Sequence, residues 1–241
     1  MHLTLIGGGW DLPAQISCLR PFVDAATSRA DGRPPRIPFV WVDEGDGTVW
    51  SERWMALVNE VAKVDGVDVA VPIGGALDVA RLDGAHGLFV CGGLTPAYAD
   101  ALAPAAAQVR RMVVEDGLPY AGSSAGAAVA SRHAVVGGYL RAGRVVCPAD
   151  AAEDLDEVTV VSGLGLLDEM VDVHASAWGT LPRLATAMGM TPDVAVGLGL
   201  DEDTAWHVTD EGAQVLGRNA VHRLERDGQG LRWTVVSAER R

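Results

Sequence analysis

Short apolar runs recur through the first half of the chain, and each is followed by a turn that contains glycine or proline. Runs of this length that are apolar at nearly every position predict strands buried on both faces. They lie at residues 3–6, 37–42, 67–72, 87–91 and 118–122. Apolar residues at helical spacing predict helices at residues 14–26, 50–64, 77–82 and 97–116. Pro21 is expected to kink or split the first of these helices.

Strands that alternate with helices in this way indicate a parallel sheet covered on both faces. After residue 130 the pattern changes to shorter strand-like pieces, at residues 139–146, 158–161, 170–173 and 194–200. The tail from 214 to 236 is typical of antiparallel strands, joined by a turn at 227–230. We find no repeat and no low-complexity linker. The sequence therefore predicts one α/β domain over residues 1–241, with a mostly parallel central sheet flanked by helices and short antiparallel C-terminal strands.

Composition narrows the classes of function. The 241 residues have a formal net charge of −13, which argues against binding to nucleic acids or anionic membranes. The cysteines at positions 18, 91 and 147 are odd in number and widely spaced, so they predict neither a disulfide framework nor a metal site. No run reaches the ~18 apolar residues of a membrane span, and the N-terminus lacks the basic region of a signal peptide. A cytoplasmic protein is therefore expected.

Two polar or glycine-rich turns have the composition of possible binding sites. The turn at residues 7–9 does not fit the dinucleotide-binding pattern, because Leu12 stands where the third glycine is required. The acidic turn at residues 43–47 lacks the full ligand series of an EF-hand, so a solvated loop is favoured over a cation site.

The segment from Gly122 to Gly126 carries the most specific chemical signal. Gly122, Ser124 and Gly126 have the Gly-x-Ser-x-Gly spacing of a nucleophile elbow, where a serine occupies a sharp strand-to-helix turn. The flanking positions must be small because the turn is tight. Such a turn exposes Oγ and directs the first N–H groups of the helix toward an oxyanion. The alternative is a loop in which Ser123 or Ser124 only caps a helix.

A serine nucleophile requires a base, and a carboxylate usually orients that base. Of the six histidines, His174 is favoured because it follows the strand-like run 170–173 and precedes a loop of small residues. A structural histidine is the alternative. For the carboxylate, Asp201, Glu202 and Asp203 follow the apolar strand 194–200, and any of them could reach His174. An acidic turn that faces water is the alternative.

Several motifs, in this order, resemble a known family. They are Gly92-Gly93-x-Thr95, Gly122-x-Ser124-Ala125-Gly126-Ala127, residues 163–167, Asp172-x-His174 and residues 197–205. Over about residues 87–220 the chain resembles peptidase family S51, which contains the aspartyl dipeptidases (peptidase E) and the cyanophycinases. The resemblance implies a fold like that of class I glutamine amidotransferases, a flavodoxin-like three-layer arrangement, with serine in place of their cysteine.

The resemblance also implies the roles of individual residues. Ser124 would be the nucleophile, His174 the general base and Glu202 the orienting carboxylate. Backbone N–H groups of Gly93 and Ala125 would form the oxyanion hole. The reaction implied is hydrolysis of a small peptide or isopeptide through an acyl-enzyme, by a serine exopeptidase or dipeptidase without a metal or other cofactor. A homodimer is compatible with this family.

The substrate-contacting residues implied by the family are Thr95, Asp172 and Arg183. The loop after the histidine is arginine-rich in the cyanophycinase branch, whereas Trp178 and Thr180 stand at those positions here. Arg183 could bind a substrate carboxylate or be a surface arginine that caps a helix. Asp172 could face the pocket or be a structural carboxylate beside the base. Two further functions remain open, an esterase or amidase and a non-catalytic binding module.

Overall fold

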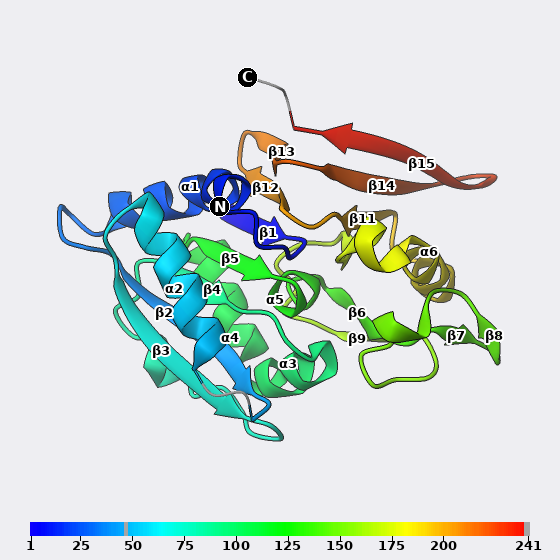
Figure 1. The fold of residues 1–241 in the computed structure, drawn as a ribbon, viewed down its shortest axis with the longest axis horizontal. Helices are drawn as coiled ribbons and strands as arrows, with labels where there is room; N and C mark the ends of the chain where they lie inside the picture. The colour runs from blue at the N-terminus through cyan, green and yellow to red at the C-terminus, as the bar shows by residue number, and fades with distance from the viewer. Residues whose placement is uncertain (46–47, 239–241) are drawn as a thin grey trace.

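The computed structural model describes residues 1–45 and 48–238, and within them a sheet of seven strands forms the centre of the molecule (Figure 1). The strand order is β13-β12-β1-β5-β4-β2-β3. The bounds are β1 His2–Ile6, β2 Arg36–Asp43, β3 Asp65–Pro72, β4 Leu88–Val90, β5 Tyr120–Ser123, β12 Thr204–Thr209 and β13 Gly212–Gly217. Strands β1 to β5 are parallel, whereas β12 and β13 add an antiparallel edge. The predicted mostly parallel sheet is thus confirmed.

Helices cover both faces of this main sheet. They are α1 Leu12–Arg29, α2 Val49–Val61, α3 Thr95–Leu102, α4 Ala106–Arg110 and α5 Ala125–Ala128. Phe39 of β2 packs in one hydrophobic cluster with Phe22 of α1 and Trp54 of α2. Its neighbour Val40 packs in the opposite cluster with Tyr98 of α3. Because successive side chains alternate between two buried faces, β2 is apolar along nearly all of its length.

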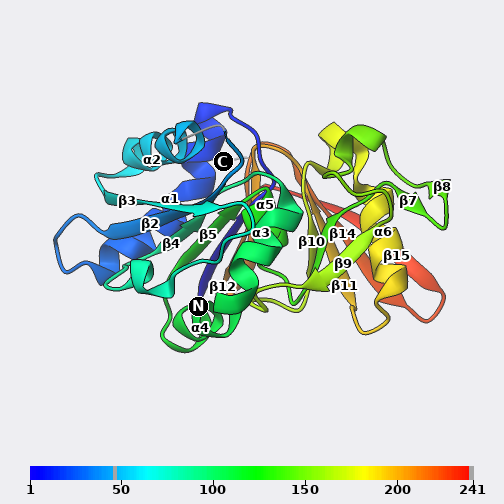
Figure 2. The ribbon, with the colours of Figure 1, turned by 90° about the horizontal axis from the view of Figure 1, so that it is seen from below.

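A second sheet lies beside the main one (Figure 2). In the described part of the chain it has four strands in the order β10-β11-β14-β15, with helix α6 packed on β11. The bounds are β10 Met170–Asp172, α6 Leu181–Met190, β11 Val196–Leu200, β14 Ala220–Asp227 and β15 Gly230–Ser237. Two short antiparallel pairs adjoin it, β6 His133–Gly137 with β9 Thr159–Ser162 and β7 Leu140–Arg141 with β8 Arg144–Val145.

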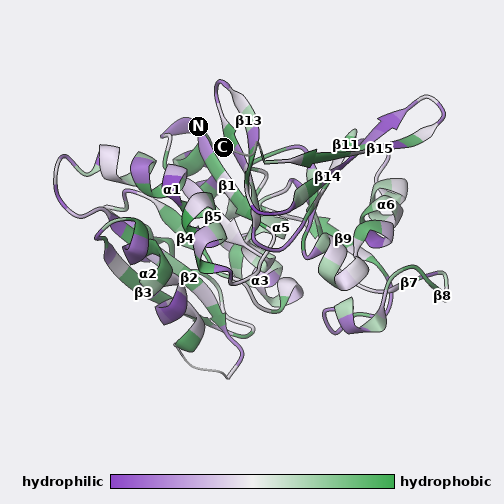
Figure 3. Cartoon of the chain, turned by 45° about the horizontal axis from the view of Figure 1, so that its top comes forward, coloured by the Kyte–Doolittle hydropathy of each residue, from purple (hydrophilic) through white to green (hydrophobic). Residues whose placement is uncertain are grey.

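The two sheets share one hydrophobic core. Leu5 of β1 and Val90 of β4 belong to the same buried cluster as Val171 of β10 and Leu198 of β11. Figure 3 shows hydrophobic residues at β4, whereas β14 and β15 become hydrophilic near the turn that joins them. The chain also passes directly from β11 in the second sheet to β12 in the main sheet. The segment between these strands, which holds residues 201–203, therefore lies at the junction of the sheets.

Three helices differ from the sequence-based expectation. Pro21 lies inside α1, which continues from Leu12 to Arg29 without a break. The helix expected at 97–116 is divided into α3, a 3₁₀ turn at Ala103–Ala105 that contains Pro104, α4, and a π turn at Arg111–Glu115. The helix expected at 77–82 is reduced to a 3₁₀ turn, Val79–Leu82. No helix of the described residues is long and apolar enough to cross a membrane. Positions 46 and 47 of the acidic turn lie outside the described residues.

Candidate active site

Ser124 occupies the sharp turn between β5 and α5. Its backbone has φ 52° and ψ −114°, a conformation that costs a residue with a side chain about 1–3 kcal/mol. The glycines on either side are required by the packing of this turn. A Cβ on Gly122 would collide with the carbonyl oxygen of Gly126, and a Cβ on Gly126 would collide with that of Val90. The Gly-x-Ser-x-Gly spacing therefore follows from a steric requirement.

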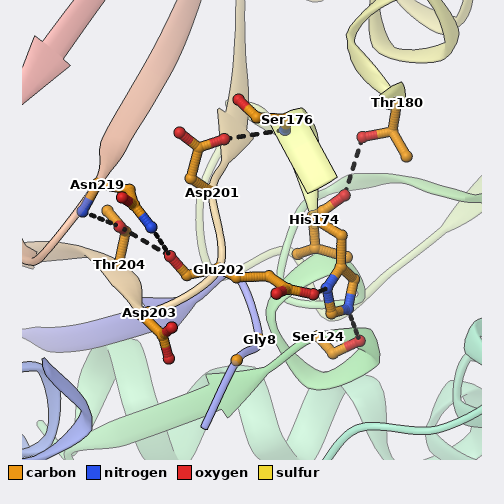
Figure 4. A network of polar contacts seen from close by, with 12 residues as sticks. Gly8, Ser124, His174, Ser176, Thr180, Asp201, Glu202, Asp203, Thr204 and Asn219 are labelled. Carbon is orange, nitrogen blue, oxygen red and sulfur yellow. Dashed lines mark hydrogen bonds and ion pairs between the residues drawn. The ribbon is translucent and has the colours of Figure 1, made fainter. Parts of the chain in front are cut away.

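Ser124, His174 and Glu202 are joined by hydrogen bonds (Figure 4). Ser124 Oγ lies 2.9 Å from His174 Nε2, and His174 Nδ1 lies 2.8 Å from Glu202 Oε1. Because an ionised carboxylate can only accept, His174 Nδ1–H donates to Glu202, which leaves Nε2 free to accept from the serine hydroxyl. A hydroxyl, an imidazole and a carboxylate in this order can generate an oxygen nucleophile.

His174 is held in place from several sides. It follows β10 with a left-handed backbone, φ 54° and ψ 35°, and its N–H donates to Gly7 O at 3.2 Å. Gly8 presses against the edge of the ring, since a Cβ at this position would collide with the imidazole. Trp178 stacks on the ring with the centroids 3.9 Å apart and the planes inclined by 9°. The glycine turn after β1 thus supports the imidazole rather than a nucleotide.

The three acids that follow β11 have separate partners. Asp201 Oδ1 accepts from the Ser176 N–H at 2.9 Å. Asp203 Oδ1 accepts from the Asp11 N–H at 2.9 Å. Only Glu202 of the three bonds to the imidazole, which answers the question that the sequence left open about which acid contacts His174.

Burial lowers the pKa of His174, and the hydrogen bond and charge of Glu202 raise it in opposition. The net shift is downward from the ordinary value of 6.5. The imidazole side chain is only 9% exposed. At neutral pH His174 is therefore mainly in its neutral form, the form that can accept a proton from Ser124.

Gly93 and Ala125, the residues expected to form the oxyanion hole, flank Ser124. Ala125 is the first residue of α5, so its N–H has no acceptor within that helix. The Gly92–Gly93 turn lies against the serine, because a Cβ on Gly92 would be 2.9 Å from Ser124 Cβ. The next N–H, that of Leu94, is already engaged, since it donates to Glu44 Oε1 at 2.7 Å.

The structure does not bring Thr95, Asp172 or Arg183 to the surface of the cavity beside Ser124. Arg183 and Asp172 form a buried ion pair instead, with Arg183 Nε 2.9 Å from Asp172 Oδ2 and an Nη atom 2.7 Å from Oδ1. A third bond joins Arg183 to the Ala151 carbonyl. Arg183 is thus a buried residue of α6 and not a surface cap, and Asp172 is a structural carboxylate beside the base. Thr95 is also buried, and its N–H donates to Glu153 Oε2 at 2.9 Å.

A cavity of about 890 Å³ opens in front of Ser124 and His174. Indole rings form much of its lining, from Trp10, Trp41, Trp50, Trp54 and Trp178. The cavity is also lined by five acidic residues, Glu44, Asp150, Glu153, Asp154 and Asp156.

Sequence reasoning missed these lining residues, except for Trp178 and for Glu44, which lies in the acidic turn at residues 43–47. One signal was present in the composition, because seven of the thirteen aromatic residues are tryptophan. Tryptophan is a large side chain with a polar edge, and a surplus of it is typical of binding surfaces.

Comparisons with known proteins agree with this arrangement. The family model for peptidase family S51 matches residues 57–216. A peptidase from an acI-B1 Actinobacterium has a similar structure, with a TM-score of 0.69 and 21% identity over 99% of this chain and 95% of that chain. A proposed peptidase E protein from Listeria monocytogenes EGD-e has a TM-score of 0.50 and 14% identity over 90% of this chain and 98% of that chain. No curated protein sequence matches the chain. The family model covers about two thirds of the chain, and both solved structures share its fold, so the chain belongs to peptidase family S51.

Proposed function

We propose that the protein is a serine peptidase that hydrolyses a small peptide or isopeptide through an acyl-enzyme. Ser124 is the nucleophile, His174 the general base and Glu202 the carboxylate that orients the base. The observation that carries this proposal is the unbroken hydrogen-bonded chain from Ser124 Oγ through His174 to Glu202 at the wall of a large cavity.

The proposed reaction has two steps. In the first, Ser124 Oγ attacks the substrate carbonyl carbon while His174 Nε2 takes the hydroxyl proton. The N–H groups of Gly93 and Ala125 stabilise the negative oxygen, and His174 then gives its proton to the departing amine. In the second, His174 takes a proton from a water molecule that attacks the ester carbonyl. The bond to Ser124 Oγ then breaks, His174 gives the proton to Oγ, and the carboxyl product is released. Glu202 stabilises the imidazolium in both steps.

The dimensions of the cavity support a small substrate. Its volume of about 890 Å³ lies within the range of pockets that enclose a drug-sized ligand, roughly 300–1,000 Å³. A di- or tripeptide has a comparable size. This supports an exopeptidase or dipeptidase rather than an enzyme that acts within long chains.

The test is covalent labelling by a serine-directed fluorophosphonate, followed by peptide mapping. We expect stoichiometric labelling at Ser124 and none in the Ser124→Ala variant. The same protein is then incubated with a panel of dipeptides of varied first residue and with β-Asp-Arg. Release of amino acids by the wild type, reduced by about 10³-fold or more in Ser124→Ala, is the expected result. Equal release by the two proteins would place the reaction elsewhere.

A second candidate is an acyl hydrolase that acts on esters or on non-peptide amides. The aromatic lining favours it, because indole rings accept many apolar acyl groups. An aryl ester in the same panel separates the two functions. Ester hydrolysis without peptide hydrolysis supports the second candidate, whereas absence of both turnover and labelling supports a non-catalytic binding module.

A further inference from the structure

The charged residues that line the cavity beside Ser124 are acidic. Its five acidic lining residues are accompanied by no arginine or lysine among the residues that the structure describes. The buried guanidinium of Arg183 is paired with Asp172. The guanidinium of Arg53 lies on the face of Trp10, which lines the cavity, but Arg53 is not itself a lining residue. A substrate carboxylate in this cavity would therefore face acidic lining residues, which repel it.

Two of the acids, Glu44 and Glu153, converge on one short backbone segment next to the nucleophile. Glu44 Oε1 accepts from the Leu94 N–H at 2.7 Å, and Glu153 Oε2 accepts from the Thr95 N–H at 2.9 Å. Leu94 and Thr95 are consecutive, so two carboxylates from loops far apart in the sequence bind neighbouring N–H groups of one turn. Each binds its backbone N–H through one oxygen, and a carboxylate has acceptor sites to spare for a further donor.

The loop that presents Glu153 is under backbone strain. Glu153 and Asp154 are consecutive non-glycine residues in the left-handed region, with φ 56° and 58°. Strained residues of this kind cluster at functional sites, where the surrounding structure holds them. Burial raises the pKa of Glu153, against the lowering effect of the Thr95 N–H. A positive group bound beside Glu153 would offset this cost of burial.

Tryptophan residues line the same cavity as these carboxylates. The rings of Trp10 and Trp54 lie with centroids 4.9 Å apart, and those of Trp10 and Trp50 5.7 Å apart. The face of Trp10 already holds a guanidinium, because Arg53 Cζ lies 3.6 Å from its ring centroid. Aromatic faces attract ammonium and guanidinium groups, and they also cover the alkyl stems of such side chains.

We propose that the residue whose carbonyl Ser124 attacks carries a basic side chain, with its stem against the tryptophans and its cation bonded to Glu44 and Glu153. The inference rests on the proposed function, because it names the substrate class of that same site. A metal ion is a poorer occupant, since no three His, Cys, Asp or Glu residues in the described part of the chain are grouped to hold one. An aspartyl side chain is also a poorer occupant, because the charged residues that line the cavity are acidic.

Binding can be tested apart from hydrolysis. The protein is the Ser124→Ala variant, and the readout is the fluorescence of the cavity tryptophans during titration. The probes are lysinamide, norleucinamide and aspartic acid α-amide, which share the free α-amine and differ in side-chain charge. We expect lysinamide to bind at least about tenfold tighter than its neutral isostere norleucinamide, and the aspartyl amide to bind no better than norleucinamide.

Variants that remove one carboxylate charge test whether Glu44 and Glu153 cause the preference for lysinamide. In the same background, Glu44→Gln and Glu153→Gln should each reduce the advantage of lysinamide over norleucinamide to about threefold or less. The matched control is Glu211→Gln, which removes one exposed acid outside the cavity and should leave the advantage intact. Circular dichroism checks that each variant is folded, and a variant that fails to fold leaves the comparison of probes on the Ser124→Ala protein to decide.

The outcomes separate this inference from the proposed function. Equal affinity for lysinamide and norleucinamide, or preference for the aspartyl amide, overturns the inference even if Ser124 is labelled by the fluorophosphonate. Selective binding of lysinamide without labelling or turnover retains the inference as a binding specificity and overturns the peptidase. Hydrolysis of Lys-Ala in preference to norleucyl-Ala and Asp-Ala by the wild type supports both.

Discussion

At the scale of single residues, two opposing influences act on the pKa of His174, the proposed base. Burial favours the neutral form of His174 and lowers its pKa, whereas the Glu202 carboxylate favours the imidazolium and raises it. Trp178, whose ring stacks on the imidazole, also covers one face of it from solvent. Because only neutral His174 can accept the serine proton, kcat/KM should fall as the pH drops through its lowered pKa, below 6.5.

The fall of kcat/KM at low pH, the acid limb of the pH profile, should move to lower pH when Glu202 is replaced. Glu202→Gln removes the charge that raises the pKa of His174, so the midpoint of the acid limb should shift to lower pH. The maximal kcat should also fall, by about 10²–10⁴-fold, because the imidazolium is no longer stabilised. The pH profile of kcat/KM measures both effects, with Glu211→Gln as the control. An acid limb that stays in place, or moves to higher pH, would show that Glu202 does not tune the base.

The backbone strain at Ser124 leads to a prediction about stability. Ser124→Ala and Ser124→Gly both remove the hydrogen bond from Oγ to His174, but only glycine adopts φ 52° and ψ −114° without strain. Relief of about 1–3 kcal/mol exceeds the cost of about 0.4–1 kcal/mol that glycine adds through the unfolded chain. We expect Ser124→Gly to have the higher free energy of unfolding, by about 1 kcal/mol, in urea titrations. Equal stability of the two variants would mean that the elbow is not strained.

At the scale of elements, the sequence predicted what local patterns determine. The parallel strands and the turn at Ser124 follow from apolar runs and glycine spacing. The loop of small residues expected after His174 is instead a π turn, Ala175–Gly179, which leads into α6. The edge strands β12 and β13 were not foreseen as part of the main sheet, because β12 pairs with β1 from the opposite end of the chain and β13 then pairs with β12. The binding of Glu44 and Glu153 to the neighbouring N–H groups of Leu94 and Thr95 has no local signal either, since each glutamate lies in a separate loop.

The elbow and helix α5 are fixed to β4 by a close approach of backbones. A Cβ on Gly126 would collide with the carbonyl oxygen of Val90, and backbone atoms cannot rotate away. We expect Gly126→Ala to lower the free energy of unfolding by more than about 2 kcal/mol and to weaken labelling of Ser124.

The control for this prediction is Gly189→Ala in α6. A Cβ there meets no atom within 4 Å, so alanine should stabilise the helix by up to about 1 kcal/mol. Urea unfolding of both variants measures the contrast. A Gly126→Ala protein as stable as the wild type would show that α5 can move away from β4 without a loss of stability.

At the scale of the whole molecule, the candidate triad is assembled across both sheets. Ser124 follows β5 of the main sheet, His174 follows β10 of the second sheet, and Glu202 lies in the segment that joins the two. The hydrophobic core is continuous from β1 to β11. Neither sheet alone can bring the three side chains together, so the relative position of the sheets determines whether the serine has its base.

This arrangement leads us to propose that residues 1–241 unfold as one cooperative unit. Trp41 and Trp54 report on the main sheet, whereas Trp178 and Trp233 lie with the second. One variant would keep a single tryptophan from the first pair, and another would keep a single tryptophan from the second pair. The fluorescence of the two variants should give the same urea midpoint, which should also be the midpoint for loss of far-UV circular dichroism. Because the junction carries Glu202, labelling of Ser124 should be lost over the same range of urea. Two separated midpoints would show that the sheets are independent cooperative units, held together mainly by the segment at residues 201–203 and not by their common core.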